Sequence, residues 1–217
     1  IRKAINAKWF NPETNLYANG TMAGQAIALY MGVVPEGKEQ AVADELARMV
    51  DENNGFLEFG SMGSKMALRM FTRYGHVDKA YEIATKEDCP SWGWWIRQGF
   101  TTLAETWELS PVFKDASVDH VFLGDVAAWY VNDLAGINFD AARPGFEHII
   151  IRPHSPEGLD RVDASYDSIK GKVRSAWKRT SNGIVMDIEI PVNTDATLIM
   201  PDGTERVLEA GTQTLVI

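Results

Sequence analysis

The fold of this chain is decided by the stretch Pro144-Gly145-Phe146-Glu147-His148-Ile149-Ile150-Ile151-Arg152, where one hydrophobic pattern gives way to another. Up to about residue 138, apolar residues recur at the spacing of amphipathic helices. After Gly136, alternating and β-branched runs indicate strands. Because Pro144-Gly145 interrupts both patterns, the sequence predicts a helical domain over residues 1–138 and a strand-rich domain over residues 139–217.

The helical part is divided by short connectors of glycine, proline and asparagine. Thr21 is a candidate cap for the first predicted helix. Short connectors make neighbouring helices antiparallel, so the pattern favours a series of helical hairpins, with a solenoid or a bundle as open alternatives. The predicted helices are residues 24–34, 39–50, 64–74, 77–85 and 121–134.

The second part carries the punctuation of an antiparallel sheet. Ser181-Asn182-Gly183 and Pro201-Asp202-Gly203 are hairpin turn signals, because asparagine and glycine accept the positive φ of a tight reversal. We therefore expect a small antiparallel β-sandwich. The predicted strands are residues 148–152, 173–179, 184–190, 197–200 and 215–217.

Charge and composition narrow the classes of partner. The 217 residues carry a formal net charge of −9, and 45% of them are apolar. Because no basic face is evident, the sequence predicts neither a nucleic acid nor an anionic membrane surface as partner. The acidic balance fits a neutral substrate, although solubility alone also explains it. No apolar run approaches the roughly 20 residues of a membrane span.

The cysteine content and the first residues bear on the setting of the chain. Cys89 has no partner for an internal disulfide and no adjacent basic residue, so we expect a buried thiol and not a nucleophile. The chain begins at Ile1 without methionine and enters an apolar-periodic segment at once. We therefore expect the C-terminal portion of a longer protein, with any targeting information upstream.

One carboxylate lies among four tryptophans where Pro90-Ser91-Trp92-Gly93-Trp94-Trp95 is followed by Thr101-Thr102-Leu103-Ala104-Glu105-Thr106-Trp107. Indole faces stack on the C–H faces of a pyranose, and a carboxylate accepts hydrogen bonds from hydroxyls or takes a proton from water. We expect Glu105 at an element's end, partly desolvated and suited to act as a general base. The alternative is a tryptophan-rich core with Glu105 salt-bridged at its rim. Glu108 is the competing carboxylate, expected in a solvated loop.

The histidines give one candidate ligand for a substrate. His120 precedes a predicted helix, where it is placed to donate to a substrate hydroxyl. The alternative is an ion pair with a neighbouring carboxylate, Asp119 or Asp115. The remaining histidines show no metal-ligand spacing, so the sequence predicts neither a metal site nor a cofactor.

Five stretches together resemble the bacterial α-L-rhamnosidases of glycoside hydrolase family 78, and they arrive in that family's order. They are Leu16-Tyr17-Ala18-Asn19-Gly20-Thr21, Pro90-Ser91-Trp92-Gly93, Thr101-Thr102-Leu103-Ala104-Glu105-Thr106-Trp107, Ser117-Val118-Asp119-His120-Val121-Phe122, and Pro144-Gly145-Phe146-Glu147-His148-Ile149-Ile150-Ile151-Arg152-Pro153. The resemblance implies the second half of an (α/α)6 barrel, the catalytic domain, over residues 1–138, followed by a C-terminal β-sandwich. It leans towards a periplasmic or extracellular setting.

The resemblance also implies a reaction and its residues. It implies an inverting glycosidase that releases terminal α-L-rhamnose from plant-type glycans or polysaccharides, with Glu105 as the general base. The family's general acid precedes residue 1, so we expect the chain to be inactive by itself. His120, Trp92 and Trp107 match substrate-binding positions. Ala104 and Asp119 depart from the family, which commonly has tryptophan and asparagine there.

Two further hypotheses concern binding. The first is a non-catalytic carbohydrate-binding protein that uses the tryptophan-rich pocket, with Glu105 as a hydrogen-bond acceptor. The second is a homodimer, because a half-barrel exposes helix faces that the other half would cover. Whether the chain is catalytic or only binds, the expected carbohydrate partner is a rhamnose-containing glycan.

Overall fold

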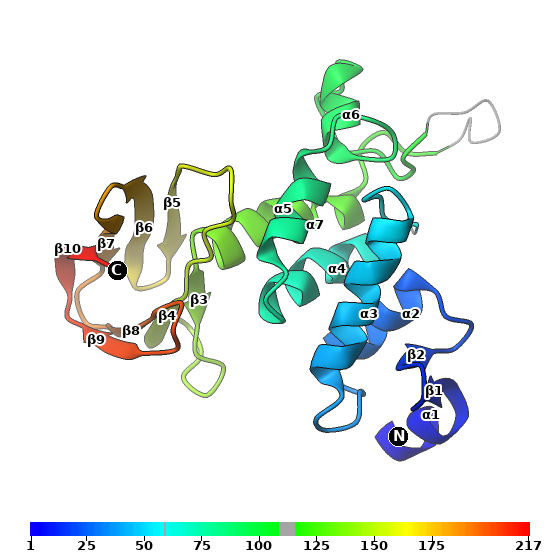
Figure 1. Cartoon of the computed structure of the whole chain (residues 1–217). Coiled ribbons are helices and arrows are strands. Elements are labelled where there is room, and N and C mark those ends of the chain that lie inside the picture. The colour runs from blue at the N-terminus through cyan, green and yellow to red at the C-terminus, as the bar shows by residue number, and fades with distance from the viewer. Residues whose placement is uncertain (59, 109–115) are drawn as a thin grey trace. The chain divides into compact units, whose positions relative to one another are not determined.

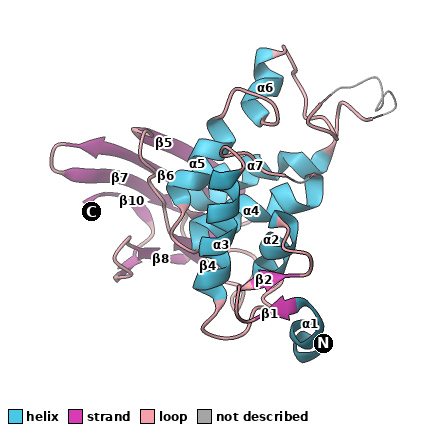
Figure 2. Cartoon of the chain, turned by 45° about the vertical axis from the view of Figure 1, so that its right-hand side comes forward, coloured by secondary structure: helices cyan, strands magenta, loops and turns pink. Residues whose placement is uncertain are grey.

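The computed structural model describes residues 1–58, 60–108 and 116–217, and it divides into two compact units. Residues 1–126 form the helical unit and residues 127–217 form the β unit (Figure 1). Helices α1 to α6 belong to the first and strands β3 to β10 to the second, as the colouring in Figure 2 makes plain. Within the described residues, no helix has the length and apolar content needed to cross a membrane.

The helical unit opens with a helix and a small hairpin, and longer helices follow. Thr21 caps the second helix as predicted, since its side chain accepts a hydrogen bond from the N–H of Gly24 at 3.2 Å. The elements are α1 (Arg2–Trp9), β1 (Phe10–Asn11), β2 (Leu16–Tyr17), α2 (Met22–Tyr30), α3 (Glu39–Glu52), α4 (Ser61–Arg73), α5 (Val77–Thr85), α6 (Trp92–Arg97) and η2 (Val121–Gly124).

Helix packing joins consecutive helices and also brings α2 against α4, two elements further along the chain. Helix α2 contacts α3 and α4, and α4 contacts α5. In α3, Val42, Leu46 and Val50 recur at four-residue spacing, and each is 0% exposed. Burial of a side chain of this size stabilises the fold by about 1.5–3 kcal/mol. The predicted helical hairpins are confirmed.

The helix predicted over residues 121–134 is divided into three pieces. The 3₁₀ helix η2 leads into α7 (Asp125–Trp129), and the π-helix η3 (Tyr130–Leu134) follows. Gly136 then turns the chain at φ +79°, where an added Cβ would lie 2.3 Å from the carbonyl carbon of Arg152. Only glycine fits this approach, so the helical stretch ends here.

The β unit contains two four-stranded sheets. Their orders are β10-β7-β6-β5 and β3-β4-β8-β9, and the described pairs are antiparallel except β4 with β8. The predicted antiparallel β domain is confirmed. The strands are β3 (Ile137–Phe139), β4 (His148–Ile151), β5 (Arg161–Ser168), β6 (Gly171–Thr180), β7 (Gly183–Ile190), β8 (Asp195–Ile199), β9 (Glu205–Leu208) and β10 (Gly211–Val216).

Both predicted turns connect adjacent strands, and the sheets share one core. Ser181-Asn182 joins β6 to β7, and Pro201-Asp202-Gly203 lies between β8 and β9. Ile149, Ile188 and Leu198 are fully buried between the strands. The compact units divide after residue 126, and the domain boundary predicted after residue 138 stays a prediction.

The start of the β unit is attached to its core by two side chains. The indole N–H of Trp177 donates to the carbonyl of Leu134 at 2.8 Å, and the hydroxyl of Ser175 donates to the carbonyl of Ala135 at 2.6 Å. Both side chains are buried. These bonds satisfy carbonyls at the end of η3 that would otherwise lack a partner.

Candidate functional site

The candidate site begins with α6, a helix that the sequence analysis did not predict. Ser91 caps it by accepting from the N–H of Trp94 at 3.0 Å, and its hydroxyl donates to the carbonyl of Lys86 at 2.7 Å. A Cβ on Gly93 would lie 2.2 Å from that same carbonyl oxygen. The start of α6 is therefore fixed closely against the end of α5.

Three tryptophan rings form one cluster beside this helix. The ring of Trp107 stacks on Trp95, with centroids 4.9 Å apart and planes 30° apart. It meets Trp92 edge to face, at 5.0 Å and 89°. Trp92 and Trp95 are 5% and 2% exposed, and Trp107 is half-buried. Such aromatic pairs contribute about 0.5–1.5 kcal/mol beyond the area they bury.

The two buried indoles also hold the backbone on either side of the site. The N–H of Trp95 donates to the carbonyl of Trp107 at 3.0 Å, and the N–H of Trp92 donates to the carbonyl of Leu123 at 2.9 Å. The first bond reaches the segment that carries Glu105, and the second reaches η2, which follows His120. One short helix thus holds both segments.

Glu105 lies in a short backbone ladder between these segments. Its N–H donates to the carbonyl of Ser117 at 2.9 Å, and the N–H of Ser117 donates back to Oε2 of Glu105 at 3.1 Å. The N–H of His120 donates to the carbonyl of Leu103 at 2.6 Å. The ladder brings the predicted base and the predicted substrate histidine onto adjacent segments.

The surroundings of Glu105 differ from the expectation in one respect. The residue is exposed, so the predicted partial desolvation is wrong for this chain. The neighbouring Ala104 is 0% exposed, because the chain turns the Glu105 side chain outwards while the residue before it packs inwards. The alternative, a carboxylate salt-bridged at the rim of a core, stays open, because residues 109–115 next to this segment lie outside the described residues.

His120 is half-buried at the residue before η2. Its ring meets that of Phe122 edge to face at 5.1 Å, and its Nδ1 is buried without a hydrogen-bond partner among the described residues. Asp119 is exposed, and in the described part of the chain it forms no hydrogen bond with His120. Asp115 lies outside the described residues. The bond to Leu103 holds the main chain of His120, and the Phe122 ring packs against its imidazole.

Cys89 and Glu108 lie beside this loop. Glu108 is exposed, as predicted, and its Oε1 lies 3.9 Å from Sγ of the half-buried Cys89. Burial raises the pKa of the Cys89 thiol, and the charge of Glu108 raises it further. A raised pKa keeps the thiol protonated, so Cys89 is a poor nucleophile.

The remaining histidines make local contacts. His76 pairs with Asp44 at 2.8 Å and His148 with Asp195 at 3.1 Å. His154 lies 3.1 Å from the carbonyl of Asp133, and burial lowers its pKa. In the described part of the chain, no group of three or more His, Cys, Asp or Glu side chains is arranged to hold a metal ion.

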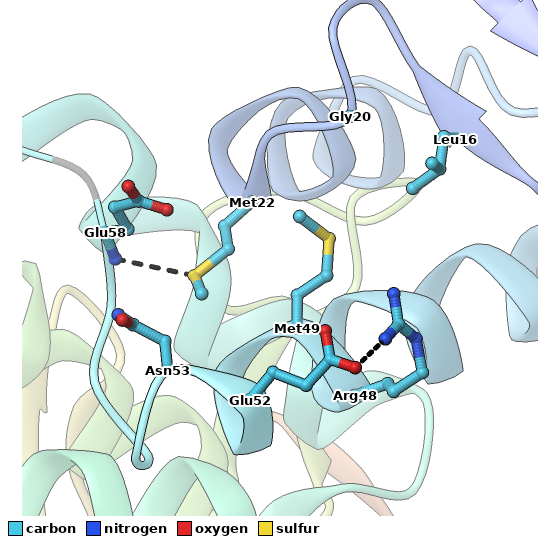
Figure 3. A pocket seen from close by; sticks show the side chains of 8 residues that line it. All are labelled: Leu16, Gly20, Met22, Arg48, Met49, Glu52, Asn53 and Glu58. Atoms are coloured by element: carbon cyan, nitrogen blue, oxygen red, sulfur yellow. Dashed lines mark hydrogen bonds and ion pairs between the residues drawn. The ribbon is translucent and has the colours of Figure 1, made fainter.

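Two hollows of about 310 Å³ each lie elsewhere in the helical unit. Figure 3 shows the first, where Glu52 pairs with Arg48 and the N–H of Glu58 approaches Sδ of Met22 at 3.4 Å. Neither shares a lining residue with the tryptophan cluster. The first is lined by Leu16, Gly20, Met22, Arg48, Met49, Glu52, Asn53 and Glu58. The second is apolar and is lined by Ile5, Trp9, Tyr17, Ala18, Gly24, Ile27, Ala28, Met31 and Val33.

Hairpins that present a carboxylate beside tryptophan rings, with a β unit after them, match a class of glycosidase. The family model described as the bacterial alpha-L-rhamnosidase 6 hairpin glycosidase domain matches residues 1–134. The model of the bacterial alpha-L-rhamnosidase C-terminal domain matches residues 136–214. The chain belongs to the bacterial α-L-rhamnosidase family.

Individual relatives agree with this assignment. An α-L-rhamnosidase of Streptomyces avermitilis is 29% identical over 95% of this chain and 20% of its own length. The crystal structure of a Streptomyces avermitilis α-L-rhamnosidase complexed with L-rhamnose superposes with a TM-score of 0.91, at 26% identity, over 100% of this chain and 23% of that one. An α-L-rhamnosidase structure from Dictyoglumus thermophilum gives 0.84 at 31% identity over 94% of this chain and 23% of that one. The chain thus spans about a fifth to a quarter of the length of these relatives.

Proposed function

We propose that this chain is part of an inverting glycosidase that releases terminal α-L-rhamnose, with Glu105 as its general base. The observation that carries the proposal is how the carboxylate is held: its Oε2 accepts the Ser117 N–H at 3.1 Å, and the carbonyl of Trp107, two residues on, accepts the indole N–H of Trp95 in the tryptophan cluster. The family assignment and the rhamnose-bound relative support the choice of sugar. Residues 1–138 would supply part of the barrel, and residues 139–217 the β-sandwich.

The reaction needs a water molecule, a base and an acid. In an inverting mechanism the water oxygen bonds to the anomeric carbon as the glycosidic C–O bond breaks on the opposite face. Glu105 takes the proton from that water, and a carboxylic acid protonates the departing oxygen. The Ser117 N–H occupies Oε2, which leaves Oε1 for the water. The proposal places the acid before residue 1, so the chain alone would be inactive.

The other residues of the proposed site hold the sugar or support its pocket. His120 lies across the ladder from Glu105 and is half-buried, which suits a donor to a substrate hydroxyl. Trp107 is half-buried and offers part of its ring to a pyranose. Trp92 is 5% exposed, so its contribution is to support Trp107 from the side.

The test uses a chromogenic α-L-rhamnoside and the full-length protein that is proposed to carry this chain. We expect Glu105→Gln to lower the hydrolysis rate roughly a hundredfold or more, because a general base contributes at least that much. Glu108→Gln is the matched control, since Glu108 is exposed on the same loop. NMR should detect β-L-rhamnose as the first product. Unchanged hydrolysis in Glu105→Gln would refute the assignment of the base.

A second candidate is a carbohydrate-binding protein without catalysis, and the exposure of Glu105 is the observation that favours it. In that case the full-length protein would hydrolyse no rhamnoside. Titration with L-rhamnose would then show binding whose affinity is the same in Glu105→Gln.

The proposal includes association of two copies through the exposed half-barrel face, and we choose the apolar hollow lined by residues of α1 and α2 as the part of that face to test. Trp9 and Met31 line it and are 46% and 59% exposed. Light scattering of the isolated chain should show dimers that Met31→Glu disperses. Met62→Glu is the control, because Met62 is 51% exposed and lies outside the hollow. A monomer over a wide concentration range would contradict the dimer.

A further inference from the structure

We propose that Trp95 is a positioning residue, which sets the place of the Glu105 carboxylate through Trp107. The inference rests on the proposed function, since it assigns a role to Trp95 in a reaction for which Glu105 is the base. Trp95 itself is 2% exposed and does not meet the solvent in front of Glu105. Its action is therefore on the backbone that carries the base.

Trp95 holds Trp107 in two independent ways. Its ring stacks on the Trp107 ring, with centroids 4.9 Å apart, and its indole N–H donates to the Trp107 carbonyl at 3.0 Å. The stack fixes the side chain, and the hydrogen bond fixes the peptide group of the same residue. Because both contacts come from a single rigid indole, Trp107 has little freedom to slide or rotate relative to α6.

Glu105 lies two residues before Trp107, so its backbone is held from both sides. On one side its own N–H donates to Ser117 and Oε2 accepts from Ser117. On the other side the chain is held at Trp107 by Trp95. Without the contacts of Trp95, Trp107 would keep its contact with Trp92 but lose the hydrogen bond to its peptide group, and the carboxylate position would depend more on the ladder.

The other tryptophans of α6 have different attachments. Trp92 donates to the carbonyl of Leu123, so its hydrogen bond holds η2 and not the Glu105 segment. Helical geometry places residues 92 and 95 on one face of α6, whereas Trp94 faces elsewhere and is half-buried. The indole hydrogen bond of Trp95 reaches the backbone two residues from Glu105.

Small shifts of a base are costly. A catalytic group must be held within about 0.5 Å of its productive place, and a displacement of about 1 Å can cost roughly a hundredfold in rate. A mutation at Trp95 that keeps an aromatic ring against Trp107 should therefore lower kcat and leave KM nearly unchanged, because the stacking that supports the sugar-facing Trp107 ring is retained and only the hydrogen bond to its carbonyl is lost.

The test compares two buried tryptophans in the full-length protein. Trp95→Phe keeps an aromatic ring and removes the N–H; we expect kcat to fall roughly tenfold to a hundredfold, with KM within about twofold. Trp177→Phe is the matched control, because Trp177 is also 2% exposed and its N–H also donates to a backbone carbonyl, that of Leu134. The control should unfold at a lower temperature but keep its kcat.

A double mutant separates positioning from general structural damage. If Trp95 acts through Glu105, Trp95→Phe should add nothing to the loss caused by Glu105→Gln, because the base is already gone. If Trp95→Phe lowered kcat by the same factor in the wild-type protein and in Glu105→Gln, the proposal would be wrong. Should Trp95→Phe fail to fold, β-(3-benzothienyl)alanine at position 95 keeps the indole shape without its N–H and should give the same fall in kcat.

The activities of Glu105→Gln and Trp95→Phe together show whether the general base or only the positioning role is wrong. If Glu105→Gln retains full activity, the assignment of the base fails, and the role of Trp95 fails with it. If Glu105→Gln is inactive while Trp95→Phe and the benzothienyl variant keep the original kcat, the base stands and the positioning role alone is wrong.

Discussion

Trp177 in the β unit and Trp95 in the helical unit make the same interaction with different consequences. Each is 2% exposed, and each donates its indole N–H to a backbone carbonyl, that of Leu134 at 2.8 Å and that of Trp107 at 3.0 Å. Leu134 is itself buried, so the bond of Trp177 completes a core. Trp107 lies two residues from the exposed Glu105. The role of a buried hydrogen bond therefore depends on what its acceptor is attached to.

The largest expected effect comes from removing either ring altogether. Trp177→Ala and Trp95→Ala should each lower the free energy of unfolding by about 3–5 kcal/mol, because each deletes a buried indole and leaves a cavity. Denaturant titration followed by circular dichroism measures the loss. A loss below about 1 kcal/mol for Trp95→Ala would show that the two indoles do not contribute alike, because the helical unit would have relaxed to fill the cavity.

A second experiment compares the two cores without involving the site. Leu46 in α3 and Leu198 in β8 are both 0% exposed. Leu46→Ala and Leu198→Ala should each cost about 2–5 kcal/mol, and the lower value will mark the unit that relaxes more readily. Val207→Ala is the control, because Val207 is 71% exposed. A control loss as large as that of Leu198→Ala would contradict the burial argument.

A smaller effect is expected at two helix caps. Ser91→Ala and Thr21→Ala should each cost about 0.5–2 kcal/mol, because each removes the acceptor for an N–H in the first turn of a helix. If α6 positions Glu105, Ser91→Ala should also lower the rhamnosidase activity proposed for the full-length protein. Thr21→Ala should leave that activity unchanged. Equal activity in the two variants would mean that α6 does not position Glu105.

The smallest effect concerns pH in the β unit. Burial lowers the pKa of His154, and the nearby Arg152 lowers it further, although the hydrogen bond to the Asp133 carbonyl opposes this. The unfolded chain then binds more protons than the folded one below the usual pKa of about 6.5. The contribution of neutral His154 is complete above that pH and is lost as the pH falls towards the lowered pKa. The free energy of unfolding, measured by denaturant titration at several pH values, should depend less on pH in His154→Gln than in the control His76→Gln.

The regular elements were predictable because their patterns are local. Four-residue spacing marks α3 through Val42, Leu46 and Val50, and the Asn182-Gly183 turn marks the β6–β7 hairpin. Strand β5 was not predicted although its residues alternate between polar and apolar from Arg161 to Asp167; most of them are exposed, and the strand lacks the β-branched run that marks the others. Helix α6 was missed because tryptophan and glycine are weak helix formers. Its fixed position depends on the Lys86 carbonyl, a contact that no sequence pattern reveals.

The candidate site was predictable in its residues and not in its geometry. Glu105, Trp92 and Trp107 were named from the sequence, and the structure brings the two rings together beside the Glu105 segment. Trp95 was overlooked as a separate element of the site. Its three-residue spacing from Trp92, after a Ser91 cap, was the signal that both rings share one helix face. The exposure of Glu105 depends on long-range contacts with Ser117, which spacing alone does not encode.

The parallel pairing of β4 with β8 has a consequence for the order of events as the chain emerges during synthesis. Strand β5 pairs with β6, and β6 pairs with β7, so these three consecutive strands can form their ladders as soon as β7 has been made. Strand β4 cannot pair with β8 until later, because Ala196, the residue opposite Ile149, is made after β5, β6 and β7. Contacts between residues so far apart in sequence form slowly. Three strands of one sheet can therefore form from consecutive hairpins, with β10 joining β7 at the end. In the other sheet, β4 lies between its early partner β3 and its late partner β8.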